Sequence, residues 1–176
     1  MTMSKRIGIP LMMAALGAMA FIALQPAEAA GFNERVSGNF IDTAIDTNED
    51  GAQANYFSGA ATGTGGATYE GLVEVDFSDP AAQCDEGIMP GDLVLYSIVR
   101  RYSNGDLLYS RLVDGYVCFD TSVGTAEFVA HAEITGGTGR FVGATGTYTA
   151  NYTIQLLVPD PLGGIGHGAF YGTTSG

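Results

Sequence analysis

The chain has 176 residues, of which 46% are hydrophobic and 15% charged, and its formal net charge is -12. This length suits one domain of ordinary size, and the apolar content excludes an intrinsically disordered chain. Proteins that bind nucleic acid carry clustered lysine and arginine, so the acidic balance argues against nucleic acid as a partner.

Residues 1–29 have the pattern of a secretory signal peptide. Lys5 and Arg6 give a positive start, an apolar run follows, and Ala27 and Ala29 supply small side chains at a cleavage site. The alternative is an uncleaved anchor, because the apolar run is close to the roughly 20 residues that span a bilayer. With the leader removed, we expect no membrane span and a secreted or periplasmic protein.

After the leader, short runs of alternating apolar and polar residues predict an all-β fold. Residues 30–52 are expected to form an N-terminal strand and an acidic loop, and residues 53–176 a single β-barrel domain. About eight antiparallel strands are predicted, and such a set closes into a barrel to hide its edges. The expected strands are 36–45, 53–63, 68–77, 93–102, 107–120, 125–134, 147–158 and 168–175.

An acidic segment before the second expected strand has the spacing of a calcium-binding loop. Asp46, Asn48 and Asp50 alternate before Gly51, and side-chain oxygens at this spacing converge on a hard cation. The position where such a loop ends in a bidentate glutamate is Phe57 in this chain. Two readings stay open, a calcium site and a polar turn without metal, and no other cofactor is expected.

Residues 93–102 and 107–120 are expected to form a hairpin around Asn104-Gly105. This dipeptide favours a two-residue turn, which would pair Tyr102 with Leu107. Arg100 and Arg111 then share one face at a barrel mouth, where they would bind the carboxylate or phosphate head of an amphipathic ligand. The alternative is that both arginines extend to solvent or pair with surface acids, and which face points inward is left open.

The two cysteines, Cys84 and Cys118, predict a disulfide in an oxidising compartment. The expected register places Cys118 opposite residue 91, so the bridge would join the 78–92 loop to the far end of the hairpin. The alternative is a pair of buried thiols without a bond.

The segment 136–146, with the sequence GGTGRFVGATG, resembles a stretch found in allene oxide cyclase-like and dirigent-like β-barrels. The resemblance implies an eight-stranded, calycin-like barrel whose apolar interior holds a small lipid-like or phenolic molecule. Phe141 is expected to close one end of this barrel, and Arg140 to bind backbone carbonyls there. No catalytic residue is carried over, because the functional residues of the family have no matching positions in this motif.

The sequence thus predicts a barrel of unassigned role that binds a small apolar or amphipathic molecule. Tyr69, Tyr148 and Tyr152 lie on the expected inner faces, either as ligand contacts or as core tyrosines with satisfied hydroxyls. One alternative is a cyclase or isomerase that shapes a hydrophobic substrate in a dry lumen. The other is a structural or interaction protein with a filled barrel, and the oligomeric state is left open.

Overall fold

The computed structural model describes residues 33–47, 49, 53–63, 65–78, 80–81, 84–158 and 166–176. The predicted leader lies outside these residues. So do Asn48 and Asp50, two of the three predicted calcium ligands.

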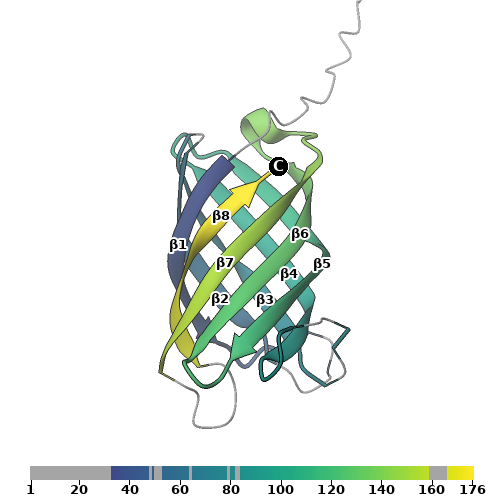
Figure 1. Cartoon of the computed structure of the whole chain (residues 1–176). Coiled ribbons are helices and arrows are strands. Elements are labelled where there is room, and N and C mark those ends of the chain that lie inside the picture. The colour runs from purple at the N-terminus through teal and green to yellow at the C-terminus, as the bar shows by residue number, and fades with distance from the viewer. Residues whose placement is uncertain are drawn as a thin grey trace, which may run out of the picture.

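Eight antiparallel strands close into one barrel, which confirms the predicted all-β architecture (Figure 1). Each strand pairs with the next one along the chain, and β8 pairs with β1. β1 therefore belongs to the barrel wall, on which Val36 pairs with Ala61 on one side and Gly172 on the other. The strands are β1 Asn33–Asp42, β2 Asn55–Gly63, β3 Ala67–Asp76, β4 Met89–Tyr102, β5 Leu107–Asp120, β6 Thr125–Gly137, β7 Gly146–Val158 and β8 His167–Ser175.

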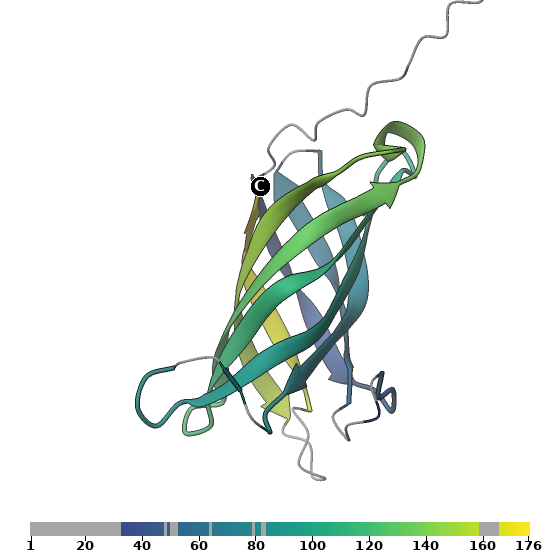
Figure 2. The same ribbon diagram turned by 90° about the vertical axis from the view of Figure 1, so that its right-hand side faces the viewer.

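The two ends of the barrel differ in which strands begin and end there. β1 begins and β8 ends at the upper end in Figure 1, where the β2–β3, β4–β5 and β6–β7 connections also lie. The remaining connections lie at the lower end, as both side views show (Figure 2). We refer to these as the upper end and the lower end below.

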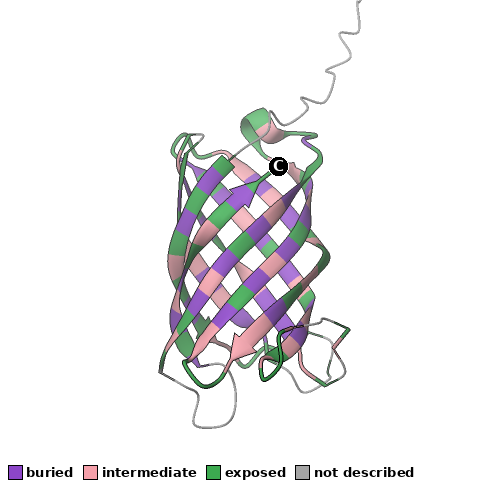
Figure 3. Cartoon of the chain, viewed as in Figure 1, coloured by how far each residue is buried: buried purple, intermediate pink, exposed green. Residues whose placement is uncertain are grey.

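Buried and more exposed residues alternate along much of the barrel wall (Figure 3). A strand directs successive side chains to opposite faces, so a period of two produces one buried face. In β6 the inward positions are small or apolar, namely Ala126, Phe128, Ala130, Ala132 and Ile134, and all are buried. The mixture of alanines and large aromatic residues lets the aromatic rings reach the barrel axis.

The β4–β5 hairpin has a loop over residues 103–105 in place of the predicted two-residue turn. The Tyr102 N–H donates to the Asp106 carbonyl at 2.9 Å, and Gly105 takes a positive φ of 88°. A left-handed glycine at this place is common in hairpin loops one residue longer than the predicted turn. Tyr102 therefore no longer pairs with Leu107; Arg101 does. A shift of one residue moves each side chain of one strand to the other face relative to its partner.

Cys84 and Cys118 form a disulfide with Cα atoms 5.7 Å apart, which confirms the predicted bridge. The shifted register places Cys118 opposite Pro90 rather than residue 91. The bond joins the connection before β4 to the lower end of β5.

The glycine-rich corner after β6 lies at the upper end (Figure 1). It contains the short 3-10 helix η1 (Gly139–Phe141), and the Phe141 ring packs against Tyr102 with centroids 4.8 Å apart. The expectation that Arg140 binds carbonyls is wrong. Its guanidinium lies 4.7 Å from the centre of the Tyr102 ring and pairs with Asp106 at 3.8 Å.

Candidate functional site

A cluster of aromatic side chains fills the middle of the barrel. The Phe57 ring centroid lies 5.3 Å from that of Phe40 and 5.1 Å from that of Phe170. Tyr152 continues the cluster, with its ring 5.4 Å from both Phe128 and Phe170. These contacts are at the separations of packed aromatic pairs. The cluster separates an apolar space at the lower end from a polar interior at the upper end.

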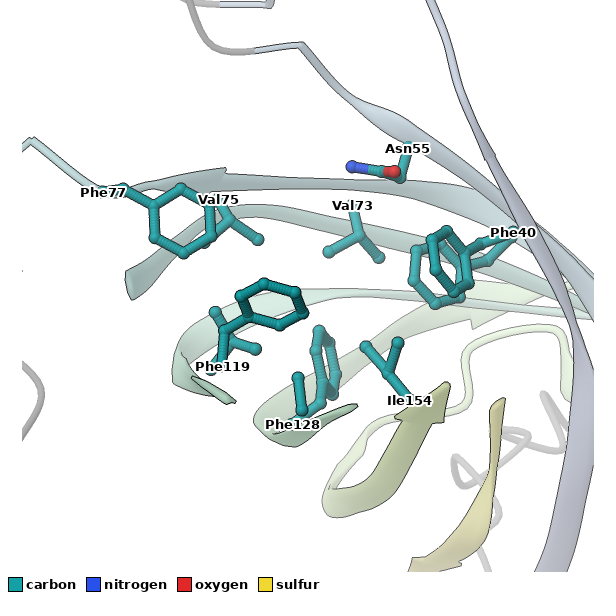
Figure 4. A pocket seen from close by; sticks show the side chains of 11 residues that line it. Phe40, Asn55, Val73, Val75, Phe77, Phe119, Phe128 and Ile154 are labelled. Carbon is teal, nitrogen blue, oxygen red and sulfur yellow. The ribbon is translucent and has the colours of Figure 1, made fainter. Parts of the chain in front are cut away.

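An apolar pocket lies between this cluster and the lower end, near the ends of β3 and β5 and the starts of β2 and β6. Figure 4 shows the side chains that line it. Its volume including the open mouth is about 390 Å³, but the centre of a water molecule can occupy only about 20 Å³ of it. That inner space is enough for one water. The lining residues come from β1, β2, β3, β5, β6 and β7, apart from Phe77, which directly follows β3. They are Phe40, Asn55, Phe57, Val73, Val75, Phe77, Val117, Phe119, Ala126, Phe128 and Ile154.

Two half-buried rings, Phe77 and Phe119, border the mouth of the pocket (Figure 4). Gly91 of β4 makes room for the first of them, because a Cβ at that position would lie 2.7 Å from the Phe77 ring. A larger residue would therefore push the ring away from the wall.

Asn55 is the one polar side chain among the described residues that line the pocket. It is in phase with Phe57 on β2, so its side chain points inward, where it lies beside Val73 (Figure 4). The side chain is 4% exposed, and its Oδ1 has no hydrogen-bond partner within the described part of the chain. Leaving a buried amide oxygen unsatisfied costs free energy.

The interior at the upper end contains a buried ion pair. The Arg100 Nε lies 3.5 Å from the Glu34 Oε2, and both side chains are almost completely buried. The guanidinium also lies over the Tyr148 ring at 4.5 Å. Burial alone would lower the pKa of Arg100, but the hydroxyl groups of Tyr148, Tyr96 and Tyr152 outweigh it, and the net pKa is raised. Arg100 is therefore charged inside the barrel.

Tyrosine hydroxyls make most of the other polar contacts of this interior. Tyr148 shares a hydrogen bond of 2.7 Å with Ser110, and Tyr96 shares one of 3.2 Å with Tyr152. Tyr69 is different, because its buried hydroxyl has no hydrogen-bond partner in the described residues. Burial raises the pKa of Tyr69, with a smaller contribution from Tyr152. Burial also raises the pKa of Tyr96 and Tyr152, so these two phenols and that of Tyr69 are held in the neutral form.

The structure separates the two arginines that the sequence placed together. Arg100 points into the barrel, whereas Arg111 is 70% exposed on the outside and pairs with Glu133. The predicted arginine mouth is therefore wrong, because it relied on the two-residue turn. The three predicted tyrosines, Tyr69, Tyr148 and Tyr152, do lie inside the barrel. None of these five residues lines the lower pocket.

Part of the lower pocket was visible in the sequence. In the expected strand 68–77, Val73, Val75 and Phe77 are in phase with Tyr69, which was expected to point inward, and these three residues line the pocket. The sequence analysis did not single out Asn55. The available signal was a polar residue two positions before Phe57, and therefore on the same face of the expected strand. What the alternation did not show was which end of the barrel has space.

The predicted calcium loop stays a prediction. Asp46 is described, but Asn48 and Asp50 are not. Among the described residues, no three histidine, cysteine, aspartate or glutamate side chains are grouped so that they could hold a metal ion.

Comparisons of this chain with protein-family models, with curated proteins and with solved structures each find no match. Within the described residues, none of the helices is both long enough and apolar enough to span a membrane.

Proposed function

We propose that this protein binds a small apolar molecule in the pocket at the lower end of the barrel. The observation that carries the proposal is the lining of this pocket, which is aliphatic and aromatic apart from a single amide. Concave apolar sites with one or a few polar groups are the usual form of a small-molecule site. The gain in binding comes from removing apolar surface from water, at roughly 25 cal/mol per Å².

Binding fits this lining better than catalysis. No described residue that lines the pocket is an acid, a base or a nucleophile, so none of these can transfer a proton or form a covalent intermediate. A cyclase that works only by shaping its substrate would need a lumen that encloses that substrate. The enclosed part of this pocket, about 20 Å³ to the centre of a water molecule, is too small for such enclosure.

The second candidate is a structural protein with a filled barrel. The observation that favours it is the aromatic cluster across the middle of the lumen, in which Phe57 contacts both Phe40 and Phe170. Under this alternative the lower pocket is a packing defect, and no ligand binds there.

We also propose that the protein is exported from the cytoplasm. The bond between Cys84 and Cys118 supports it, because disulfides persist in oxidising compartments such as the periplasm and the exterior. The resemblance of the 136–146 corner to allene oxide cyclase-like barrels is also a proposal. The closed eight-stranded barrel is compatible with it.

Toluene binding to the purified protein tests the proposal. We expect toluene to raise the melting temperature of the protein and to show ligand-detected NMR contacts with aromatic protein protons. The Ala126→Leu variant adds a larger side chain between Phe119 and Ile154, its partners on β5 and β7, and should abolish binding. Ala60→Leu, on the exposed side of β2, is the matched control and should bind as the unmodified protein does.

The controls separate the two candidates. If toluene binds neither the unmodified protein nor Ala60→Leu, while both retain their fold by circular dichroism, the filled structural barrel replaces the binding role. Binding that survives in a folded Ala126→Leu variant would place the ligand elsewhere on the molecule.

A further inference from the structure

We propose that the ligand of the lower pocket is electrically neutral and carries one hydrogen-bonding group, a hydroxyl or an amide, that binds Asn55. This inference rests on the proposed function and specifies the chemical class of the ligand. Asn55 becomes the residue that selects among apolar molecules of similar size.

The position of Asn55 is set by the barrel wall. It pairs with Asp42 of β1 and with Val73 of β3, and the inward phase of β2 directs its side chain to the pocket. A leucine would occupy a similar volume with no polar atom to satisfy. The amide therefore carries a desolvation cost that a ligand with a matching group removes.

The geometry of the amide allows a match with a hydroxyl group. An asparagine side chain offers both an acceptor oxygen and a donor N–H₂, and a hydroxyl can be donor or acceptor. The Oδ1 atom is buried and has no hydrogen-bond partner among the described residues, so a ligand O–H or N–H can donate to it once the side chain rotates toward the pocket. Because the inner space holds only one water, a ligand with a single flat ring or one alkyl chain would occupy the open mouth of the pocket as well.

The charges around the pocket argue for a neutral ligand. Among the residues that the structure describes, no arginine or histidine lines it, and the buried cation Arg100 is paired with Glu34 at the upper end. On the outside of β3, between Val73 and Val75, Glu74 is completely buried and accepts a hydrogen bond from the Thr47 N–H. A carboxylate in the pocket would lose its hydration without meeting a positive charge.

Three probes of one shape test this inference: toluene, p-cresol and 4-methylbenzoate. They share a methylated ring and differ in having no polar group, a hydroxyl or a charge. We would measure their dissociation constants for the unmodified protein, for Asn55→Leu and for Asn151→Leu. Asn151 is exposed on the outside of β7, so its variant is the matched control for loss of one amide.

We expect Asn55→Leu to weaken p-cresol binding by about three- to ten-fold relative to toluene, the range of one hydrogen bond between neutral groups. Asn151→Leu should leave this ratio unchanged. The 4-methylbenzoate anion should bind the unmodified protein at least about ten-fold more weakly than p-cresol, because a buried unpaired charge is far more costly than a satisfied hydroxyl.

Each contrary result overturns a different statement. An unchanged p-cresol to toluene ratio in Asn55→Leu would show that a water satisfies the amide, so the inference fails while the binding role stands. Equal binding of 4-methylbenzoate and p-cresol would overturn neutrality. Failure of both neutral probes to bind the unmodified protein would overturn the proposed function itself.

A second measurement does not depend on the variant folding. The side-chain amide signals of Asn55 in a ¹⁵N-labelled sample should shift when p-cresol is added and change little with toluene. Equal shifts with both probes would overturn the role assigned to Asn55.

Discussion

Arg100 on β4 and Glu34 on β1 form an ion pair inside the barrel, with the Nε and Oε2 atoms 3.5 Å apart and 2% and 1% of the side chains exposed. Thr174 of β8 donates a hydrogen bond of 3.4 Å to the same carboxylate oxygen. The pair thus links strands that are not neighbours in the wall. Two charges at this depth lose nearly all of their hydration, and only their mutual attraction and the adjacent polar groups compensate.

Removing one member of this pair should destabilise the protein strongly. Arg100→Met leaves Glu34 charged in the interior, and we expect the free energy of unfolding to fall by about 3–5 kcal/mol in urea denaturation. The double variant Arg100→Met with Glu34→Leu should recover most of this loss, since no charge is left unpaired. Arg111→Met removes an exposed pair with Glu133 and should change stability by less than about 1 kcal/mol. A double variant no more stable than Arg100→Met alone would contradict this account.

The disulfide should contribute both to the stability of the protein and to ligand binding in the lower pocket. Cys84 and Cys118 are 34 residues apart, and a loop of this size gives roughly 3–4 kcal/mol in the chain-entropy treatment. We expect Cys84→Ala with Cys118→Ala to lose this amount in urea denaturation. Because Val117 and Phe119 flank Cys118 and line the pocket, toluene binding should weaken as well. Reductant should bring the unmodified protein to the stability of the double variant, and a reductant effect on that variant would speak against the assignment.

Alanine substitutions at Gly139 and Gly143, in the corner after β6, should differ in how strongly they destabilise the protein. Gly139 and Gly143 both take positive φ values, 55° and 74°, so alanine strains the backbone at either position. At Gly139 a Cβ would also overlap the Asp106 carboxylate, whereas at Gly143 it would meet no atom within 4 Å. Gly139→Ala should therefore lower the unfolding midpoint in urea by clearly more than Gly143→Ala. Equal losses would mean that the Asp106 contact adds nothing beyond backbone strain.

Alkaline pH should unfold the barrel through its buried phenols. Burial raises the pKa of Tyr69, Tyr96 and Tyr152 well above the ordinary value of about 10. A raised pKa in the folded state favours the neutral phenol, so this contribution is complete below about pH 10 and is lost as the pH rises further. The part of the phenolate absorbance at 295 nm that comes from these buried tyrosines should rise in the same cooperative step as the loss of circular dichroism. Tyr152→Phe should reduce the amplitude of that step. A gradual rise of the whole absorbance in the folded protein would refute the prediction.

Local patterns in the sequence were sufficient for the elements and for part of the interior. The period of two in 68–77 and 147–158 marked strands and placed Tyr69, Val75 and Tyr152 on inner faces, because alternation within a strand depends only on that strand. The cysteine pair was also predicted and is confirmed.

The register between β4 and β5 was decided by the hairpin loop and not by the pattern within either strand. Alternation on β4 and on β5 does not specify how the two strands slide past one another; the hairpin loop does. The loop has one residue more than Asn104-Gly105 suggested, with Gly105 left-handed, and this was enough to put Arg100 inside and Arg111 outside.

By itself, the amino-acid sequence determined that the chain forms about eight strands, that they alternate between an apolar and a polar face, and that two cysteines are available to bond. Only the tertiary structure decided that Arg100 meets Glu34, that aromatic rings fill the middle of the lumen, and that space remains at the lower end beside Asn55. These features depend on closure of β8 onto β1, which brings side chains far apart in the sequence into one interior. How completely those side chains fill the interior depends on packing in three dimensions, and the pattern along one strand does not specify that packing.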